Sequence, residues 1–306
     1  MDRIDAMVAL LDVVKDGSFS AAARRLGVAP TSLTRKVTEL EARLGVRLLN
    51  RTTRSLTLTE AGTTYVVAAR RIVDDVEETE RVVTGEYAAP RGELVITAPT
   101  MFGQHHIVPI VAQFLARFPQ VDVRLLLTDA IVHLVDERVD LAVRLGALGD
   151  SSLVARQVGA MRTVVCASPG FLSIHGEPRH ANNVTTMPTI AVGRTTHQRP
   201  AWALRDRAAG GVMNVPIAPR LLVTTNEAAV AAAVLGVGLT QQRLYQVADG
   251  LASGALRLCL RDLEAPPEPV HIVQIARDYL PLKSRKFIEF ACPLLQERLA
   301  TLGRGA

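Results

Sequence analysis

The sequence predicts an α/β protein that carries a small helical domain at its amino terminus. Three observations lead to this fold class: helical apolar spacing with a dense cationic cluster at the start, one long helical pattern, and strand-like segments alternating with helical ones after residue 93. Such alternation is typical of α/β folds with largely parallel sheets. A chain of 306 residues is long enough for two or three domains, each with its own core.

Charge is unevenly distributed along the chain. The net charge is +5, but residues 24–54 hold eight Lys or Arg against two acids, and residues 59–88 hold three against seven. This indicates that the first part alone meets a polyanion. The longest apolar run, 228–239, is too short for a bilayer, and the start lacks a signal peptide. We therefore expect a cytoplasmic protein with no membrane partner.

The cysteines and the paired histidines favour no metal site. Cys166, Cys259 and Cys292 are far apart, odd in number and surrounded by apolar residues, so buried structural thiols are expected, with a redox switch left as the alternative. His105 and His106 have no third ligand at a recognisable spacing, so we expect surface or cleft-lining histidines. No metal or cofactor is predicted.

Three helices are expected at the amino terminus. The first ends at Gly17, Ser18 caps the second, and Gly27 suits a left-handed exit from it. Pro30 fits the first position of the third helix, where its missing N–H has no partner anyway. The third helix buries an apolar stripe of Leu33, Val37, Leu40 and Leu44.

The opposite face of the third helix carries short hydroxyls and an arginine. Its members are Thr31, Ser32, Thr34, Arg35 and Thr38. These groups suit base edges and phosphates in a major groove, and the second helix braces the third as in a helix-turn-helix. On these residues alone, a two-helix turn in a core or interface stays open as the alternative.

A hairpin and a long helix are expected next. The segment VRLLNRTTRSLTLTEAG has two alternating runs around Thr52 and Thr53, which predict a β-hairpin. Arg47, Arg51 and Arg54 decorate it and fit a wing on the phosphates or in a minor groove, although each alone fits solvated surface arginine. The long helix then carries a narrow seam of residues spaced alternately by four and three, which predicts a linker helix that pairs two chains. The seam residues are Tyr65, Ala69, Ile72, Val76, Thr79 and Val83. AAPRG, residues 88–92, ends it as a hinge.

The rest of the chain predicts strands, helices and two subdomains with a cleft between them. The expected strands are ELVITAP, VDVRLLLTD, VDLAVRLG, RTVVCASP, TIAVGR, RLLVTTN, ALRLCL and VHIVQIAR. The expected helices run from about 101 to 117, through Leu134, from 227 to 236, and from 282 to about 299.

The nearly continuous stretch GSFSAAARRLGVAPTSLTRKVTELEARLGVRLLNRTTRSLTLTEAG, residues 17–62, resembles the LysR-type transcriptional regulators. PRGELVITAPTMFG, DLAVRLGALGDSSLVARQVG and VVCASPGFL extend the resemblance, which is greatest to the CrgA-type branch. It implies a winged helix-turn-helix, a linker helix and a periplasmic-binding-protein-like effector domain. The implied bounds are 1–59 for DNA binding, 60–88 for the linker helix, 89–93 for the hinge and 94–306 for the effector domain. Subdomain I would span about 94–162 and 268–306, and subdomain II about 163–267.

The resemblance also implies partners. The third helix would read an interrupted, AT-rich inverted repeat in double-stranded DNA, within a homotetramer built as a dimer of dimers with antiparallel linker helices. RNA polymerase is a candidate partner. Ser18 matches a phosphate contact and Arg54 the wing contact, whereas Ala29 stands where polar residues are common and weakens the helix cap. The candidate DNA contacts are Ser18, Ser20, Thr31, Ser32, Thr34, Arg35, Lys36, Thr38, Arg51 and Arg54.

Candidate effector contacts follow the expected strands. Thr100 opens a helix whose N–H groups suit an anion, and the family commonly places Ser or Thr there against the inducer; an ordinary cap fits the sequence equally. Thr128, Arg144 and Gly146 end the next two strands, where α/β folds bind ligands, and a solvated strand end fits Arg144 equally.

The second subdomain contributes its own helix start. Thr224 and Glu227 predict a capping box at a helix beginning that faces the same cleft, so Thr225 and Asn226 either contact the ligand or cap the helix. The segment TQQR, 240–243, departs from the apolar residue and Leu-Pro usual in the family, which affects ligand polarity or coupling. The candidate effector contacts are Thr100, Met101, Phe102, Thr128, Arg144, Gly146, Thr225 and Asn226. Helix N-termini and a cation favour a small carboxylate as the effector.

The expected function is regulation of transcription in response to a small-molecule effector. An α/β enzyme is the alternative from another class, but the chain shows no nucleophile elbow, no Gly-rich dinucleotide loop and no paired metal ligands, so no enzyme is expected. An architectural DNA-binding protein without an effector response is the third hypothesis.

Overall fold

The computed structural model describes residues 2–51, 56–83, 89–130, 132, 134, 137, 139–149, 153–193, 200–207, 209–276 and 280–304. The chain divides into two compact units, Met1–Ala89 and Pro90–Ala306. In the described part of the chain, no helix combines the length and the apolar character that crossing a membrane would require.

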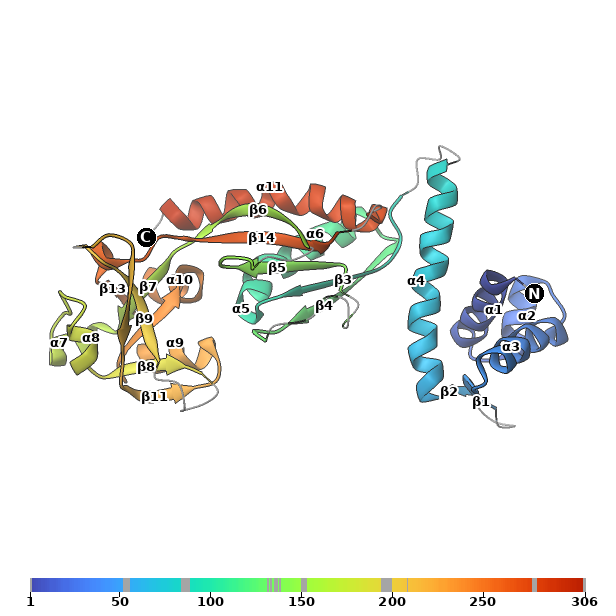
Figure 1. The fold of residues 1–306 in the computed structure, drawn as a ribbon, viewed down its shortest axis with the longest axis horizontal. Helices are drawn as coiled ribbons and strands as arrows, with labels where there is room; N and C mark the ends of the chain where they lie inside the picture. The colour runs from blue at the N-terminus through green and yellow to red at the C-terminus, as the bar shows by residue number, and fades with distance from the viewer. Residues whose placement is uncertain are drawn as a thin grey trace. The chain divides into compact units, whose positions relative to one another are not determined.

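Helices α1 (Arg3–Lys15), α2 (Phe19–Leu26) and α3 (Pro30–Leu44) open the first unit (Figure 1). The Ser18 hydroxyl oxygen accepts the N–H of Ala21 at 3.1 Å, and Gly27 ends α2 at a φ of 67°. Pro30 begins α3, and Ala29, the residue at the N-cap of α3, makes no side-chain hydrogen bond to the helix. The predicted helix starts and stops are confirmed because each is encoded by one or two neighbouring residues.

One aliphatic core holds these helices together. It includes the predicted stripe residues Leu33, Val37 and Leu40, together with Leu10 and Val13 of α1. Leu44 is 39% exposed, so the predicted stripe ends one turn earlier than expected. The buried stripe leaves the other face of α3 turned away from this core.

The two strands of the predicted wing pair as a hairpin. β1 (Leu49–Arg51) pairs antiparallel with β2 (Leu56–Leu58). The predicted turn around Thr52 and Thr53 lies outside the described residues. Two Glu41 hydrogen bonds, accepted from the N–H groups of Leu48 and Leu49 at 2.8 and 3.0 Å, hold the first strand against α3.

Helix α4 (Glu60–Val83) follows the hairpin directly, as the predicted linker helix does. The N–H of Gly62 donates to the hydroxyl oxygen of Thr59 at 2.9 Å. A Cβ on Gly62 would lie 1.9 Å from the Leu48 carbonyl oxygen, so glycine is required for α4 to pass this close to the hairpin.

The predicted seam of α4 is displaced from the face that the unit buries. Val66, Ala69 and Val73 are buried and α4 packs against α1. Ala69, a predicted seam residue, is therefore already used inside the unit, whereas Ile72 is 42% exposed. The side chain of Val83 lies outside the described part. The predicted seam therefore overlaps, at Ala69, the face of α4 that packs inside the unit.

The second unit begins with a five-stranded sheet in the order β4-β3-β5-β14-β6. Its strands are β3 (Gly92–Ala98), β4 (Val121–Leu127), β5 (Leu141–Leu145), β6 (Leu153–Met161) and β14 (Glu268–Ile275). β3 runs parallel to β4 and β5, whereas β14 runs antiparallel to β5 and β6. Helices α6 (Val108–Arg117) and α11 (Leu282–Arg304) pack against this sheet (Figure 1).

A second sheet of five strands has the order β11-β8-β12-β7-β13. Its strands are β7 (Thr163–Ala167), β8 (Thr189–Val192), β11 (Pro219–Val223), β12 (Leu239–Arg243) and β13 (Arg257–Cys259). A hairpin of β9 (Ala201–Arg205) and β10 (Val212–Pro216) accompanies it. The helical segments of this part are α7 (Pro169–His175), α8 (Asn183–Thr186), α9 (Asn226–Val234), α10 (Leu244–Ala252) and the 3₁₀ turn η2 (Arg261–Leu263).

Two expectations about these sheets are wrong. Both sheets are mixed rather than largely parallel, because the chain crosses between them twice and its returning strands enter antiparallel. The helical stretch expected through Leu134 is also absent from the described residues of 128–140. Leu134 and Val139 instead pack as loop residues against one face of the first sheet.

Candidate DNA and effector sites

The polar face of α3 lies on the outside of the first unit. Leu33 and Val37 are buried, whereas Thr31 and Thr38 are exposed, Ser32 and Thr34 are half-buried, and the Arg35 side chain is 75% exposed. The Thr34 hydroxyl donates to the Pro30 carbonyl at 3.0 Å, which directs it along the helix. The structure thus places the predicted hydroxyls and Arg35 on the solvent side of one helix.

The cations of this unit differ in how firmly they are held. Arg35 lies 3.8 Å from Glu39, a loose and exposed contact, and Lys36 lies 3.3 Å from Asp5 of α1. Arg25 is different, because its guanidinium pairs with Asp12 of α1 and with Asp16, the residue that caps the end of α1. Arg25 therefore joins α2 to α1, and Arg35 keeps its reach towards a ligand.

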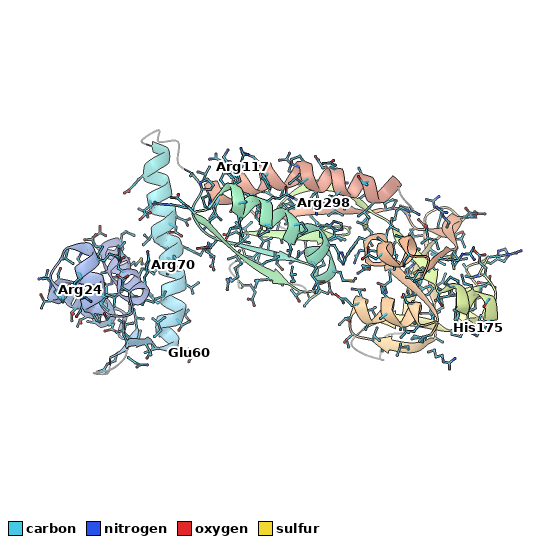
Figure 2. All side chains as sticks on the ribbon, turned by 180° about the vertical axis from the view of Figure 1, so that it is seen from behind. Arg24, Glu60, Arg70, Arg117, His175 and Arg298 are labelled. Carbon is cyan, nitrogen blue, oxygen red and sulfur yellow. The ribbon has the colours of Figure 1, made fainter. Side chains whose placement is uncertain are left out.

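The remaining predicted DNA contacts lie at the edges of this face. Ser18 is half-buried and its oxygen caps α2, while Ser20 on the first turn of α2 is exposed. Arg24 lies on the same small helix, and Glu60 marks the start of α4 (Figure 2). The Arg51 side chain and Arg54 lie outside the described residues.

The helix start at Thr100 already holds a carboxylate. The N–H of Thr100, the first residue of α5 (Thr100–Phe102), donates to the Asp129 carboxylate at 3.2 Å. Thr128 accepts the N–H of Ala130 at 3.1 Å, so its hydroxyl shapes the same loop. The chain's own anion therefore occupies the position that was predicted to attract an effector anion.

Met101 and Phe102 belong to the core of the second unit rather than to its surface. They are 8% and 0% exposed. The Phe102 ring lies 4.7 Å from the His106 ring and 5.3 Å from the Tyr245 ring, measured between centroids. Tyr245 belongs to α10, so this ring cluster joins the first sheet's helices to those of the second.

His105 is exposed and His106 is buried, and both line a hollow of about 470 Å³ beside Arg298, which agrees with the expectation of surface or cleft-lining histidines. His106 lies in a π-helical turn, Gly103–Ile107, that links α5 to α6. Burial and the nearby His105 and Arg298 lower its pKa to about 4, so the ring is neutral at pH 7. Among the described residues, its Nε2 has no hydrogen-bond partner.

Arg144 already has a hydrogen-bond partner within the chain. Its Nη2 donates to the carbonyl of Val132 at 3.2 Å, and burial lowers its pKa. By strand alternation Arg144 shares the sheet face of Ala142, which packs with Leu134 and Val139. Gly146, at a φ of 101°, donates its N–H to the Pro269 carbonyl at 2.9 Å.

The predicted capping box of α9 is wrong by one residue. Thr225 is the cap, and its hydroxyl accepts the N–H of Ala228 at 3.2 Å. Thr224 precedes the cap, so Glu227 falls at the second helical position and cannot complete the box. Thr225 is exposed and Asn226 half-buried at this helix start.

The sequence prediction missed three residues where the two sheets meet. Arg243 of β12 pairs with Glu268 of β14 at 2.9 Å, and Tyr245, two residues after Arg243, packs edge-on against Phe102 at an interplanar angle of 87°. Burial raises the pKa of Tyr245 to about 12, with Asp129 and Glu227 adding to the rise and Arg243 opposing it. The TQQR segment was the available signal, because it places a charge where the resemblance implies apolar residues.

The cysteines, the candidate metal ligands and the hollows add no further effector contact. All three cysteines are buried as predicted, and burial raises the pKa values of Cys166 and Cys259 to about 12. No cluster of three metal-ligating side chains occurs in the part of the chain that the structure describes. Two hollows, of about 620 Å³ beside Arg179 and Leu260 and of about 470 Å³ beside His105, His106 and Arg298, are lined by residues other than the predicted effector contacts.

Comparisons with known proteins agree with this arrangement. Residues 4–63 match the family described as bacterial regulatory helix-turn-helix protein, lysR family, and residues 88–293 match the LysR substrate binding domain. An HTH-type transcriptional regulator of Xanthomonas campestris is 38% identical over 293 residues, which cover 94% of this chain and 84% of the relative.

Two solved structures share the fold over nearly the whole chain. CrgA, a LysR-type regulator from Neisseria meningitidis, has a TM-score of 0.60 at 30% identity and covers 96% of this chain and 98% of its own. Full-length AphB, a virulence activator of Vibrio cholerae, has a TM-score of 0.58 at 25% identity and covers 95% and 98%. The chain therefore belongs to the LysR family of transcriptional regulators, with a helix-turn-helix domain followed by a substrate binding domain.

Proposed function

We propose that this protein regulates promoters in the cytoplasm by docking α3 into the major groove of an interrupted inverted repeat. The observation that carries the proposal is the division of α3 into a buried apolar stripe and an outward face of hydroxyls and Arg35. Such a face fits base edges, while the surrounding cations fit phosphates.

We infer that two chains pair through α4, and that two such dimers associate. Ile72 remains 42% exposed beside the buried face of α4, and Val76, one turn further along, is half-buried, so both leave apolar surface for another copy. A two-fold dimer matches the symmetry of an inverted repeat, since each half-site receives one recognition helix.

We infer further that the second unit binds a small carboxylate. Helix starts at Thr100 and Thr225 support this ligand class, because N–H groups and the helix dipole favour anions there. The Thr100 N–H donates to the Asp129 carboxylate, which supports an anionic ligand at this position, and an effector would compete with that carboxylate.

DNA selection from a random library tests the docking model. The wild-type protein should enrich an inverted repeat, and Arg35→Ala should lose about 1–3 kcal/mol of discrimination at particular base pairs. Arg43→Ala is the matched control, since Arg43 lies in the last turn of the same helix. Equal losses on selected and random DNA for Arg35→Ala would contradict base recognition by Arg35.

Calorimetry with full-length protein tests the effector class. Small organic acids should bind, and Thr100→Val should weaken them by about 1–3 kcal/mol if the hydroxyl contacts the ligand. The same variant should bind the selected DNA normally, because the helix-turn-helix is unchanged. Binding of neutral compounds alone would contradict the carboxylate class, and turnover of the ligand would favour an enzyme.

A further inference from the structure

Two arginine–glutamate pairs hold the region where the chain passes between the two sheets. Arg162 follows β6 and Glu264 follows η2, so this pair ties one crossing segment to the other. Arg162 Nε and Nη2 each donate to a different oxygen of Glu264, both at 2.9 Å. The side chains are 21% and 13% exposed, so this is a shielded, fully formed fork.

The pair between Arg243 and Glu268 is built differently. Arg243 Nε and Nη2 both donate to the same oxygen, Oε2, at 3.2 and 2.9 Å. Among the described residues, none donates to the other oxygen of Glu268. The side chains are 32% and 41% exposed. Arg243 is therefore a reachable cation whose present partner uses half of its carboxylate.

This pair lies among the predicted effector contacts. Glu268 Oε2 is 3.9 Å from the position of a Cβ on Gly146, and Arg243 precedes Tyr245, whose ring contacts Phe102.

The other candidate receptors are less available. The Arg144 guanidinium donates to Val132, and the Thr100 N–H donates to Asp129. A bidentate carboxylate can offer Arg243 the fork geometry that Glu268 does not complete. An exposed ion pair also contributes little free energy, so replacing Glu268 costs little.

We propose that Arg243 receives the effector's carboxylate and that Glu268 is the internal carboxylate that the effector displaces. The proposal rests on the carboxylate class proposed above. Displacement breaks a link between β12 in the second sheet and β14 in the first, while the Arg162–Glu264 pair keeps the crossing segments together. Effector binding is thereby coupled to the relation between the sheets, because the ligand binds better to the state in which Glu268 is released.

Calorimetry on the full-length chain at low salt tests this exchange, with acetate, succinate, malate and benzoate as probes and benzamide as the neutral match for benzoate. We expect Arg243→Gln to weaken the best carboxylate about tenfold or more. Glu268→Gln should strengthen it about two- to fivefold, since the competing charge is gone. Arg124→Gln, which removes a 45% exposed arginine of β4, is the control and should change the affinity less than about twofold. Benzamide should bind no better to Glu268→Gln than to wild type.

Several outcomes separate this inference from the proposed function. A loss with Arg144→Gln but not with Arg243→Gln overturns the exchange and leaves the carboxylate class standing. Failure of all four acids to bind wild-type protein overturns the exchange and that class, while selection of an inverted repeat would still support DNA docking. Should Arg243→Gln fail to fold, Arg243→Lys keeps the charge without the fork, and unchanged carboxylate affinity in that variant also overturns the proposal.

Discussion

The two units treat their polar side chains in opposite ways. In the first unit, Arg35 is 75% exposed with one loose neighbour, so the face of α3 is open before any ligand arrives. In the second unit, Thr100 and Arg144 already have protein partners, and Arg243 is paired with Glu268. A DNA duplex can dock on a prepared surface, whereas an effector has to replace internal contacts. In our proposal, that replacement couples a small ligand to the protein's structure.

Neighbouring residues of α4 should separate folding of the first unit from its assembly. Val73→Asp places a charge at a position that is 7% exposed, and we expect a loss of about 3 kcal/mol or more in the free energy of unfolding. Ile72→Asp, at a position 42% exposed, should cost less than about 0.5 kcal/mol yet disrupt the oligomer. Thermal melts and sedimentation measure the two effects. An intact oligomer in folded Ile72→Asp would contradict pairing through this face.

Salt should affect the two binding events very differently. Operator affinity should fall linearly with log salt at a slope of roughly −4 or steeper, a loss of about 10²-fold between 50 and 200 mM, because DNA binding releases counterions. Binding of a single carboxylate should change by less than about tenfold over the same range. Titrations of selected DNA and of the best acid measure both slopes. A flat response for DNA would contradict phosphate docking.

Acid should destabilise the second unit through His106. Because the pKa of His106 is lowered to about 4, the unfolded chain protonates first as pH falls, so stability present above about pH 6.5 is lost towards pH 4. The loss from this group should reach at most about 3 kcal/mol. His106→Leu should flatten the decline in denaturant melts from pH 7 to 4, and the exposed His105→Gln should not. Parallel curves for wild type and His106→Leu would count against this assignment.

The smallest expected effect concerns the anion at the start of α5. Asp129→Asn keeps an oxygen for the Thr100 N–H but removes the charge, so a carboxylate effector should bind about two- to fivefold more tightly. Asp122→Asn is the control, since Asp122 is an exposed acid on β4 of the same sheet. Weaker carboxylate binding in Asp129→Asn would mean that the Asp129 charge assists the ligand.

The helix-turn-helix could be predicted almost residue by residue from its sequence. Ser18 defines a helix end through its side-chain oxygen, and Gly27 and Pro30 do so through their backbone conformation. The spacing of Leu33 and Val37 defines the buried face. These signals act over one or two helical turns, so they do not depend on the rest of the chain. The second unit was predicted as α/β for the same local reason, through its strand and helix patterns.

The tertiary structure decided the features that depend on contacts between residues far apart in the sequence. β6 and β12 were missed as strands, and their antiparallel neighbours make both sheets mixed. Arg162 and Glu264 are 102 residues apart, and Arg243 and Glu268 are 25 apart, so no local pattern announces either pair. The sequence by itself determined the helix ends, the cationic cluster of residues 24–54 and the family. Which sheet face Arg144 shares, and which carboxylate Arg243 holds, followed from packing, because those partners meet only after the chain has crossed between the sheets twice.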